Sequence, residues 1–219
     1  MSNSEQASSF DDLDLTCSST RCEAGLHYFG PAFRKRSAYP LGHCLKCGVH
    51  LVDWGRVHQR AGDDVNYLIS MLRLEYWRHD WWDHRPIDTT AVNHARRKGT
   101  IVLRENAKHI LRKYVCSPNR RDGVQTRTTG NIIAYAQHAT GTCCRKCLAY
   151  WHGLPVDEEV TETSIDYLSE IIMTYVTFRL PDLAADGIYV PRRASPLHPP
   201  SPVRPVVHDS SDMTVREHR

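Results

Sequence analysis

The sequence has no hydrophobic run near the roughly 18 apolar residues that a membrane span requires. It also lacks a secretory signal, because its beginning, MSNSEQASSFDDLDLTCSST, has neither a basic flank nor an apolar core. We therefore expect a cytoplasmic protein without a membrane partner. In that compartment the eight cysteines are expected to be thiols or metal ligands rather than disulfides.

Acidic residues are nearly missing from residues 96–146, which hold twelve lysines and arginines but only Glu105 and Asp122. The local net charge is +10, whereas residues 151–190 carry −7 and the whole chain carries +3. Ordinary surface mixing rarely leaves such an excess, so the window predicts a phosphate-binding surface and DNA as the partner. The alternative is a solvated helix face whose bases pair with the acidic segment.

Helical periodicity dominates the middle of the chain, and only residues 41–54 have strand character. We predict a mainly α fold, with a compact helical domain and a small zinc-knuckle or hairpin subdomain. The expected helices begin after Asp63 or Asp64, cover 104–115 and 130–139, and run from the capping box Thr163-x-x-Asp166 to Pro181. The expected divisions are a disordered tail at 1–25, a zinc-knuckle segment at 26–60, a helical core at 61–190 and a proline-rich tail at 191–219.

Two C-x-x-C pairs predict a metal site. Cys44 and Cys47 precede Gly48, which permits the tight turn of a metal knuckle, and Cys144 and Cys147 form the second pair. Together they would supply one closed, structural Cys₄ zinc site that ties distant segments together. The alternate ligands are Cys143, His138 and His152. An iron–sulfur cluster, a redox dithiol and buried apolar thiols are the alternatives to zinc.

Residues 100–178 carry motifs that resemble a small bacterial family known only as a domain of unknown function. The motifs are Asp122-Gly123-x-Gln125-Thr126, then AQHAT-x-TCCR-x-CL at 136–148, then WHGLP at 151–155. Leu154 stands where the family motif implies isoleucine, and the histidines implied near Asn106 and Asn131 are missing. The resemblance implies a self-contained metal site of Cys143, Cys144, Cys147 and a histidine, and it implies no activity.

The polar stretch directly before the second cysteine pair is where we expect chemistry. Excision of a base requires one carboxylate, a pocket for the flipped base and a basic surface for the backbone. Asp122 is the candidate acid, base or cation stabiliser, Gln125 and Asn131 would read the base, and His138 is the third candidate catalytic residue. The bases expected to hold phosphate are Arg96, Arg97, Lys98, Arg120, Arg121, Arg127, Arg145 and Lys146.

These patterns favour a zinc-stabilised protein that acts on DNA as a hydrolytic N-glycosylase. A nuclease is less favoured, because the basic window has no D-x-E or E-x-K pair; the nearest acidic cluster is RHDWWDH at 78–84. Residues of these types also suit a non-catalytic zinc module that binds nucleic acid or a partner protein, or a redox or metal-responsive regulator that uses Cys143, Cys144 and Cys147. By analogy with other orphan bacterial domains, we expect a role in defence against foreign, phage DNA.

Overall fold

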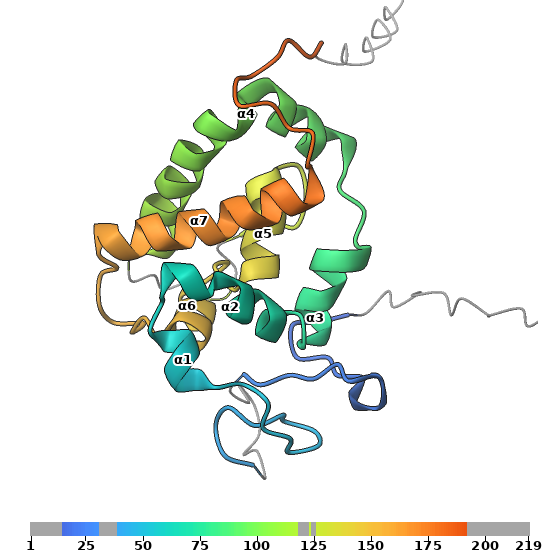
Figure 1. Cartoon of the computed structure of the whole chain (residues 1–219), viewed down its shortest axis with the longest axis vertical. Helices are drawn as coiled ribbons and strands as arrows, with labels where there is room; N and C mark the ends of the chain where they lie inside the picture. Colours follow the sequence, from blue (N-terminus) through green and yellow to red (C-terminus); the bar gives the residue numbers. More distant parts are fainter. Residues whose placement is uncertain (1–14, 31–38, 118–122, 124–125, 192–219) are drawn as a thin grey trace, which may run out of the picture.

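The computed structural model describes residues 15–30, 39–117, 123 and 126–191 (Figure 1). Within these ranges the chain has helices, two isolated β-bridges and no strand, which confirms the mainly α prediction. None of the described helices combines the length and apolar character needed to traverse a bilayer. The α-helices are α1 (Trp54–His58), α2 (Val65–Leu72), α3 (Tyr76–His79), α4 (Thr89–Ile110), α5 (Ile132–Thr140), α6 (Arg145–His152) and α7 (Glu162–Arg179).

Helices α5 and α7 form the centre of the main core, and Figure 1 shows α7 crossing the molecule in front of α5. Apolar side chains of α7 recur at helical spacing and are buried, as at Ile165, Leu168 and Ile172. The helix ends before Pro181, as predicted. Its N-cap, however, is Thr161 rather than Thr163, because the Thr161 hydroxyl accepts from the Ser164 N–H at 3.3 Å.

Helix α4 bends at Gly99, whose φ of 67° and ψ of 170° are not helical. The segment that follows α7 docks in the bend, where the Ile188 N–H donates to the Arg96 carbonyl at 2.9 Å. A Cβ on Gly99 would lie 2.3 Å from the Ala185 carbonyl oxygen, so only glycine fits there. The helix predicted over 104–115 is therefore the second part of a longer, bent helix.

Three ion pairs connect α4 and the π-helix η4 (Leu111–Val115) to α7 at intervals of four residues. The pairs are Arg104–Glu170, Lys108–Asp166 at 2.7 Å and Arg112–Glu162 at 2.5 Å. From one pair to the next, the residue numbers of the bases rise while those of the acids fall. The two helices are therefore antiparallel, and the three pairs form a ladder. For these three bases the structure matches the alternative interpretation of the basic window, in which bases pair with the acidic segment.

Residues 15–30 and 39–60, here called the N-terminal segment, lie at the end of the molecule opposite the bend of α4 (Figure 1). Residues 41–54 were predicted to form a zinc knuckle or a hairpin with strand character. The structure supports the knuckle, since turns and the start of α1 take the place of strands there and Cys44 and Cys47 join other potential metal ligands. Part of the tail predicted to be disordered is also structured, because Cys22–Ala24 form the 3-10 helix η1 and Arg21 pairs with Leu26 in a β-bridge. Residues 1–14 of the predicted tail at 1–25, and residues 192–219 of the predicted tail at 191–219, lie outside the described residues.

Candidate metal centres and a polar pocket

Four potential metal ligands meet in the N-terminal segment, and we call Cys22, His27, Cys44 and Cys47 the first cluster. Their ligand atoms all lie within 4.8 Å of one another. The Cys22 and Cys44 sulfurs are 3.8 Å apart, and the Cys47 sulfur is 3.5 Å from His27 Nδ1. A tetrahedral ion with Zn–S bonds of about 2.3 Å and Zn–N bonds of about 2.0 Å separates two sulfurs by about 3.8 Å and sulfur from nitrogen by about 3.5 Å. The first cluster therefore has the spacing of one tetrahedral ion.

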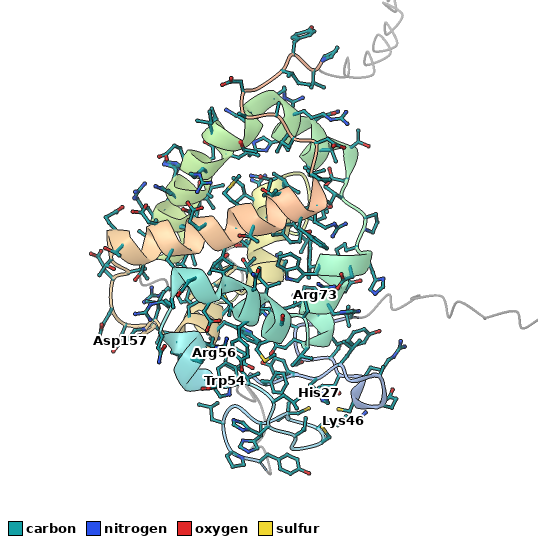
Figure 2. The ribbon with its side chains drawn as sticks, in the orientation of Figure 1. His27, Lys46, Trp54, Arg56, Arg73 and Asp157 are labelled. Atoms are coloured by element: carbon teal, nitrogen blue, oxygen red, sulfur yellow. The ribbon has the colours of Figure 1, made fainter. Side chains whose placement is uncertain are left out.

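The backbone around Cys44 prepares its thiol for a metal ion. Gly48 has a φ of 75°, and its N–H donates to the Cys44 carbonyl at 2.9 Å, which closes the turn. Burial raises the pKa of Cys44, but backbone hydrogen bonds, led by that of Cys47, outweigh it and lower the pKa to about 6. A thiolate is the form that binds metal. Figure 2 shows that His27 and Lys46, from two separate stretches, come together in this part of the molecule.

The second cluster consists of the Cys143, Cys144 and Cys147 thiols, again within 4.8 Å of one another. It lies at the N-terminus of α6, where Cys144 is the N-cap residue and the helix dipole favours negative charge. The Cys143 and Cys147 sulfurs are 3.5 Å apart, and Arg78 Nη2 donates to the Cys147 sulfur at 3.6 Å. Hydrogen bonds from Cys143 and Cys144, and then the Arg78 charge, hold the pKa of Cys147 well below its usual range. The second cluster is therefore a second candidate metal centre.

The structure does not bring the two C-x-x-C pairs together into the predicted Cys₄ site. Cys44 and Cys47 belong to the first cluster, and Cys144 and Cys147 belong to the second. The partners of the first pair are Cys22 and His27, neither of which was predicted to bind metal. The alternate ligand Cys143 does join the second cluster.

The two histidines considered as alternate ligands lie outside both clusters. The His138 ring stacks on Trp81 with centroids 4.7 Å apart, and its Nε2 is 3.0 Å from the Arg127 carbonyl oxygen. Burial lowers the pKa of His138 to about 4, so the ring is neutral at pH 7. His152 is fully buried, with Nε2 3.0 Å from the Thr140 carbonyl oxygen. Both rings therefore pack and hydrogen-bond within the helical core and are not part of either cluster.

Glu75 joins the N-terminal segment to α3 and α6. Its carboxylate accepts from the Phe29 N–H at 3.1 Å, the Tyr150 hydroxyl at 3.0 Å, Trp151 Nε1 at 3.1 Å and Arg78 Nε at 2.7 Å. Glu75 and Arg78 are both buried, and Arg78 also reaches the second cluster. Burial raises the pKa of Glu75, whereas the Arg78 charge lowers it. This buried ion pair therefore connects the N-terminal segment to helices α3 and α6.

Acid is expected to destabilise the protein through His152. Burial lowers its pKa from 6.5 to about 4, so the folded state binds fewer protons than the unfolded chain between these values. Stability is therefore full above pH 6.5 and falls as the pH drops through this window, by about 1 kcal/mol between pH 7 and 5.5. Urea denaturation at both pH values measures the loss. His152→Gln, which keeps a donor for Thr140, should lose less stability than wild type between the two pH values. The exposed control His109→Gln should lose as much as wild type, and an equal loss in the two variants would contradict the assignment.

A polar pocket of about 610 Å³ lies between α4 and α5. This size falls within the range of small-molecule sites. Asn106 and Asn131, near which the family resemblance implies histidines, are both lining residues, one from each side of the pocket. None of the described residues that line it is acidic. The lining residues are Thr90, His94, Asn106, His109, Ile110, Tyr114, Thr126, Arg127, Thr129, Gly130, Asn131, Ala134 and Gln137.

The residues predicted to contact nucleic acid have different environments. Arg127 is exposed and lines the pocket, and Asn131 lines it while its side chain accepts from the Ile133 N–H at 2.9 Å as the N-cap of α5. On α4, Lys98 is half-buried, and the other predicted bases there, Arg96 and Arg97, are exposed, as is Lys146 on α6. The predicted residues Arg120, Arg121, Asp122 and Gln125 lie outside the described part of the chain.

Arg145 is a correction to the predicted phosphate surface. It is only 1% exposed, and its guanidinium donates to backbone carbonyls, including that of Cys116 at 2.9 Å. The other acceptors are the carbonyls of Pro155, Val156 and Glu158. Arg145 therefore holds the chain that follows η4 against the chain that follows α6, where phosphate has no access to it.

Comparison with known proteins gives one family likeness. Residues 69–177 match the model of a family described as a domain of unknown function (DUF4186). This range includes the second cluster and the polar pocket but not the first cluster. No solved structure matches the chain. The likeness supports the resemblance to an uncharacterised family.

Proposed function

Starting from the likeness of residues 69–177 to a domain of unknown function, we propose that this chain is a zinc-stabilised protein that acts on DNA. The proposed reaction is hydrolytic excision of a base by an N-glycosylase, with the flipped base held in the polar pocket. The pocket between α4 and α5 is the observation that carries the proposal. Defence against foreign DNA, such as that of phage, is the role that we propose for this reaction.

Zinc is the proposed metal because the ligands and their spacing suit it. Thiolate and imidazole ligands together favour zinc among the common divalent ions. An iron–sulfur cluster distributes its cysteines over several iron atoms, whereas the ligand atoms here lie within 4.8 Å of one another. Four protein ligands close a zinc site, so the first cluster has a structural role.

The pocket offers the groups that a flipped base requires. Tyr114, 46% exposed, can stack on a base, and Asn106 and Asn131 carry amides of the kind that pair with base edges. Arg127, an exposed base of the basic window, also lines the pocket, and the DNA backbone would lie beside it. The size of the pocket, the amide and hydroxyl side chains in its lining and the exposed Arg127 therefore favour a nucleotide as the ligand.

Asp122 is the proposed catalytic carboxylate, and Gln125 is proposed to contact the base. Asp122 precedes the lining residue Thr126 by four positions, which an extended chain spans in at most roughly 14 Å. Asp88, by contrast, is occupied, since it accepts from the Gly130 N–H at 2.7 Å and the Tyr135 hydroxyl at 2.9 Å. These contacts favour the stretch just before Thr126 for the catalytic role.

The nuclease alternative has less support. In the acidic cluster RHDWWDH, Asp80 lies 2.7 Å from Arg85, and Asp83 lies 2.6 Å from Arg73. Both carboxylates therefore have arginine partners in place of a metal ion. A non-catalytic nucleic-acid-binding module is the second candidate, favoured by the lack of acidic side chains among the described lining residues.

The proposal predicts that the wild-type protein produces abasic sites. Single-stranded and duplex DNA, including DNA with modified bases, would be incubated with the protein and then heated in alkali. Asp122→Asn should bind DNA normally but react at least about 100-fold more slowly, the usual effect of losing an acid–base group.

Tyr114→Ala should bind single-stranded DNA about tenfold more weakly, because base stacking is worth about 1–3 kcal/mol.

Matched controls are Asp157→Asn and Tyr189→Ala, which change an exposed acid and an exposed aromatic residue outside the pocket. Strand breaks that appear without alkali would identify a nuclease instead. Intact DNA with salt-sensitive binding would leave the binding module. Wild-type rates in Asp122→Asn would remove Asp122 from the mechanism.

A further inference from the structure

The second cluster has three thiols, whereas a closed tetrahedral site requires four ligands. The two nearby histidines are committed elsewhere, since His138 stacks on Trp81 and His152 is bonded to Thr140 inside the core. A fourth protein ligand would therefore come from another part of the chain. The segment that starts at residue 15 is the part that reaches this region.

Contacts with α3 hold this segment in place. The Arg21 guanidinium lies 5.3 Å from the centre of the Tyr76 ring, and the Tyr76 N–H donates to the His27 carbonyl at 3.1 Å. Figure 1 shows the segment passing beside α3, the helix whose Arg78 donates to Cys147. The first residues of the segment therefore approach the second cluster from its α3 side.

Cys17 is the cysteine of this segment that has no place in the first cluster. Its thiol is close enough to Cys147, Arg78 and Glu75 for their charges to act on it, and burial, followed by the Cys147 charge, raises the pKa of Cys17. The same groups act on the Tyr28 hydroxyl, because burial, and then the charges of Glu75, Cys17 and Cys147, raise its pKa. These interactions agree with the path of the segment beside α3, whose Arg78 contacts Cys147, and they put Cys17 near the second cluster but outside the group of three thiols.

We propose that Cys17 is the fourth ligand of a second structural zinc site, together with Cys143, Cys144 and Cys147. Cys17 stands just outside the group of three, so binding would draw its turn inward. That turn is held by local bonds, with Thr16 and Ser19 bonded to each other at 3.0 Å, and the Cys17 residue as a whole is exposed although its thiol is partly desolvated. A short displacement therefore breaks no core contact.

The charge around the site fits four thiolates. Four thiolates and one Zn²⁺ leave a net charge of −2, and each thiol releases its proton to solvent as it binds. Arg78, which already donates to the Cys147 sulfur, supplies a buried positive charge beside them. The site would fasten the start of the N-terminal segment to α6. This structural role goes beyond the proposed function, and it does not depend on whether the chain acts on DNA.

The test is zinc content under competition. Wild type, Cys17→Ser, Cys17→His and Cys116→Ala, purified with zinc in the medium, would be weighed by native mass spectrometry and titrated with a chelator. Cys116 is the matched control, since it is a buried cysteine outside both clusters. We expect two zinc ions per chain in wild type and Cys116→Ala. Cys17→Ser should lose one of them at a chelator concentration at least tenfold lower, and Cys17→His, which still offers a ligand, should recover part of that resistance.

Three outcomes would overturn the proposal. One is a Cys17→Ser protein that holds both ions as firmly as wild type. Another is a wild-type protein with a single zinc ion, or with a disulfide within the second cluster. The last is an equal loss of zinc in Cys17→Ser and Cys116→Ala, which would indicate general destabilisation. None of these readouts depends on DNA, so they separate this site from the proposed reaction.

Discussion

Cys44→Ser is expected to lose the metal ion of the first cluster and, with it, the fixed structure of the N-terminal segment. A structural zinc ion supplies about 10–16 kcal/mol of apparent binding free energy at pH 7, and this becomes folding free energy. Apart from the Glu75 bond to Phe29, the segment is held mainly by a small core that its buried apolar residues, such as Phe29 and Val52, form with α2 and α6. Limited proteolysis read by mass spectrometry should show early cuts between residues 15 and 60, together with a lower zinc content.

Lys46→Ala is the matched control for this experiment, because Lys46 lies in the same turn, is exposed and is no ligand (Figure 2). It should keep the zinc content and the cleavage pattern of wild type. The helical core should resist the protease in all three proteins, because its main cluster is separate from the small core. Normal zinc content in Cys44→Ser would rule out the first cluster as a metal site.

Glu75→Ala is expected to lower the free energy of unfolding by about 3–5 kcal/mol. The substitution leaves the Arg78 charge buried without its carboxylate and removes the acceptor of the Phe29, Tyr150 and Trp151 donors. Urea denaturation at constant zinc concentration measures the change.

Two further variants identify the cause of that loss. Glu162→Ala removes an exposed carboxylate of an ion pair and should change stability little. Glu75→Met combined with Arg78→Met removes both buried charges, so it should be more stable than Glu75→Ala alone. A double variant as unstable as Glu75→Ala would indicate that packing, rather than an unpaired charge, causes the loss.

The helices were predictable where apolar residues recur regularly. Helices α5 and α7 have this pattern and form the core, and the aromatic residues Trp81 and Trp82 are buried in it. The first half of α4, TTAVNHARRKG, is mostly polar, so its helix depends on the N-cap Asp88 and on docking at Gly99. Such tertiary contacts leave no periodic signal in the sequence.

The metal ligands were predictable as residue types but not as sets. Spacing identifies each C-x-x-C pair, yet it does not say which distant residues complete the site. Cys22 and His27 complete the first pair, and their proximity in sequence to Cys44 was the available signal. The prediction that Arg145 binds phosphate was wrong for a related reason. The sequence shows that a base lies between two cysteines, but it does not show the backbone carbonyls that accept hydrogen bonds from it inside the fold.

If the chain binds DNA as we propose, the ion-pair ladder between α4 and α7 limits how strongly salt weakens that binding. Each phosphate contact releases condensed counterions, so the slope of log K against log salt concentration counts the bases in use, at about 0.9 per contact on duplex DNA. The ladder occupies three of the twelve bases in 96–146, and burial removes Arg145, which leaves eight. With the ladder intact, the window would contribute a slope of about −7, whereas its sequence charge alone would permit nearly −11.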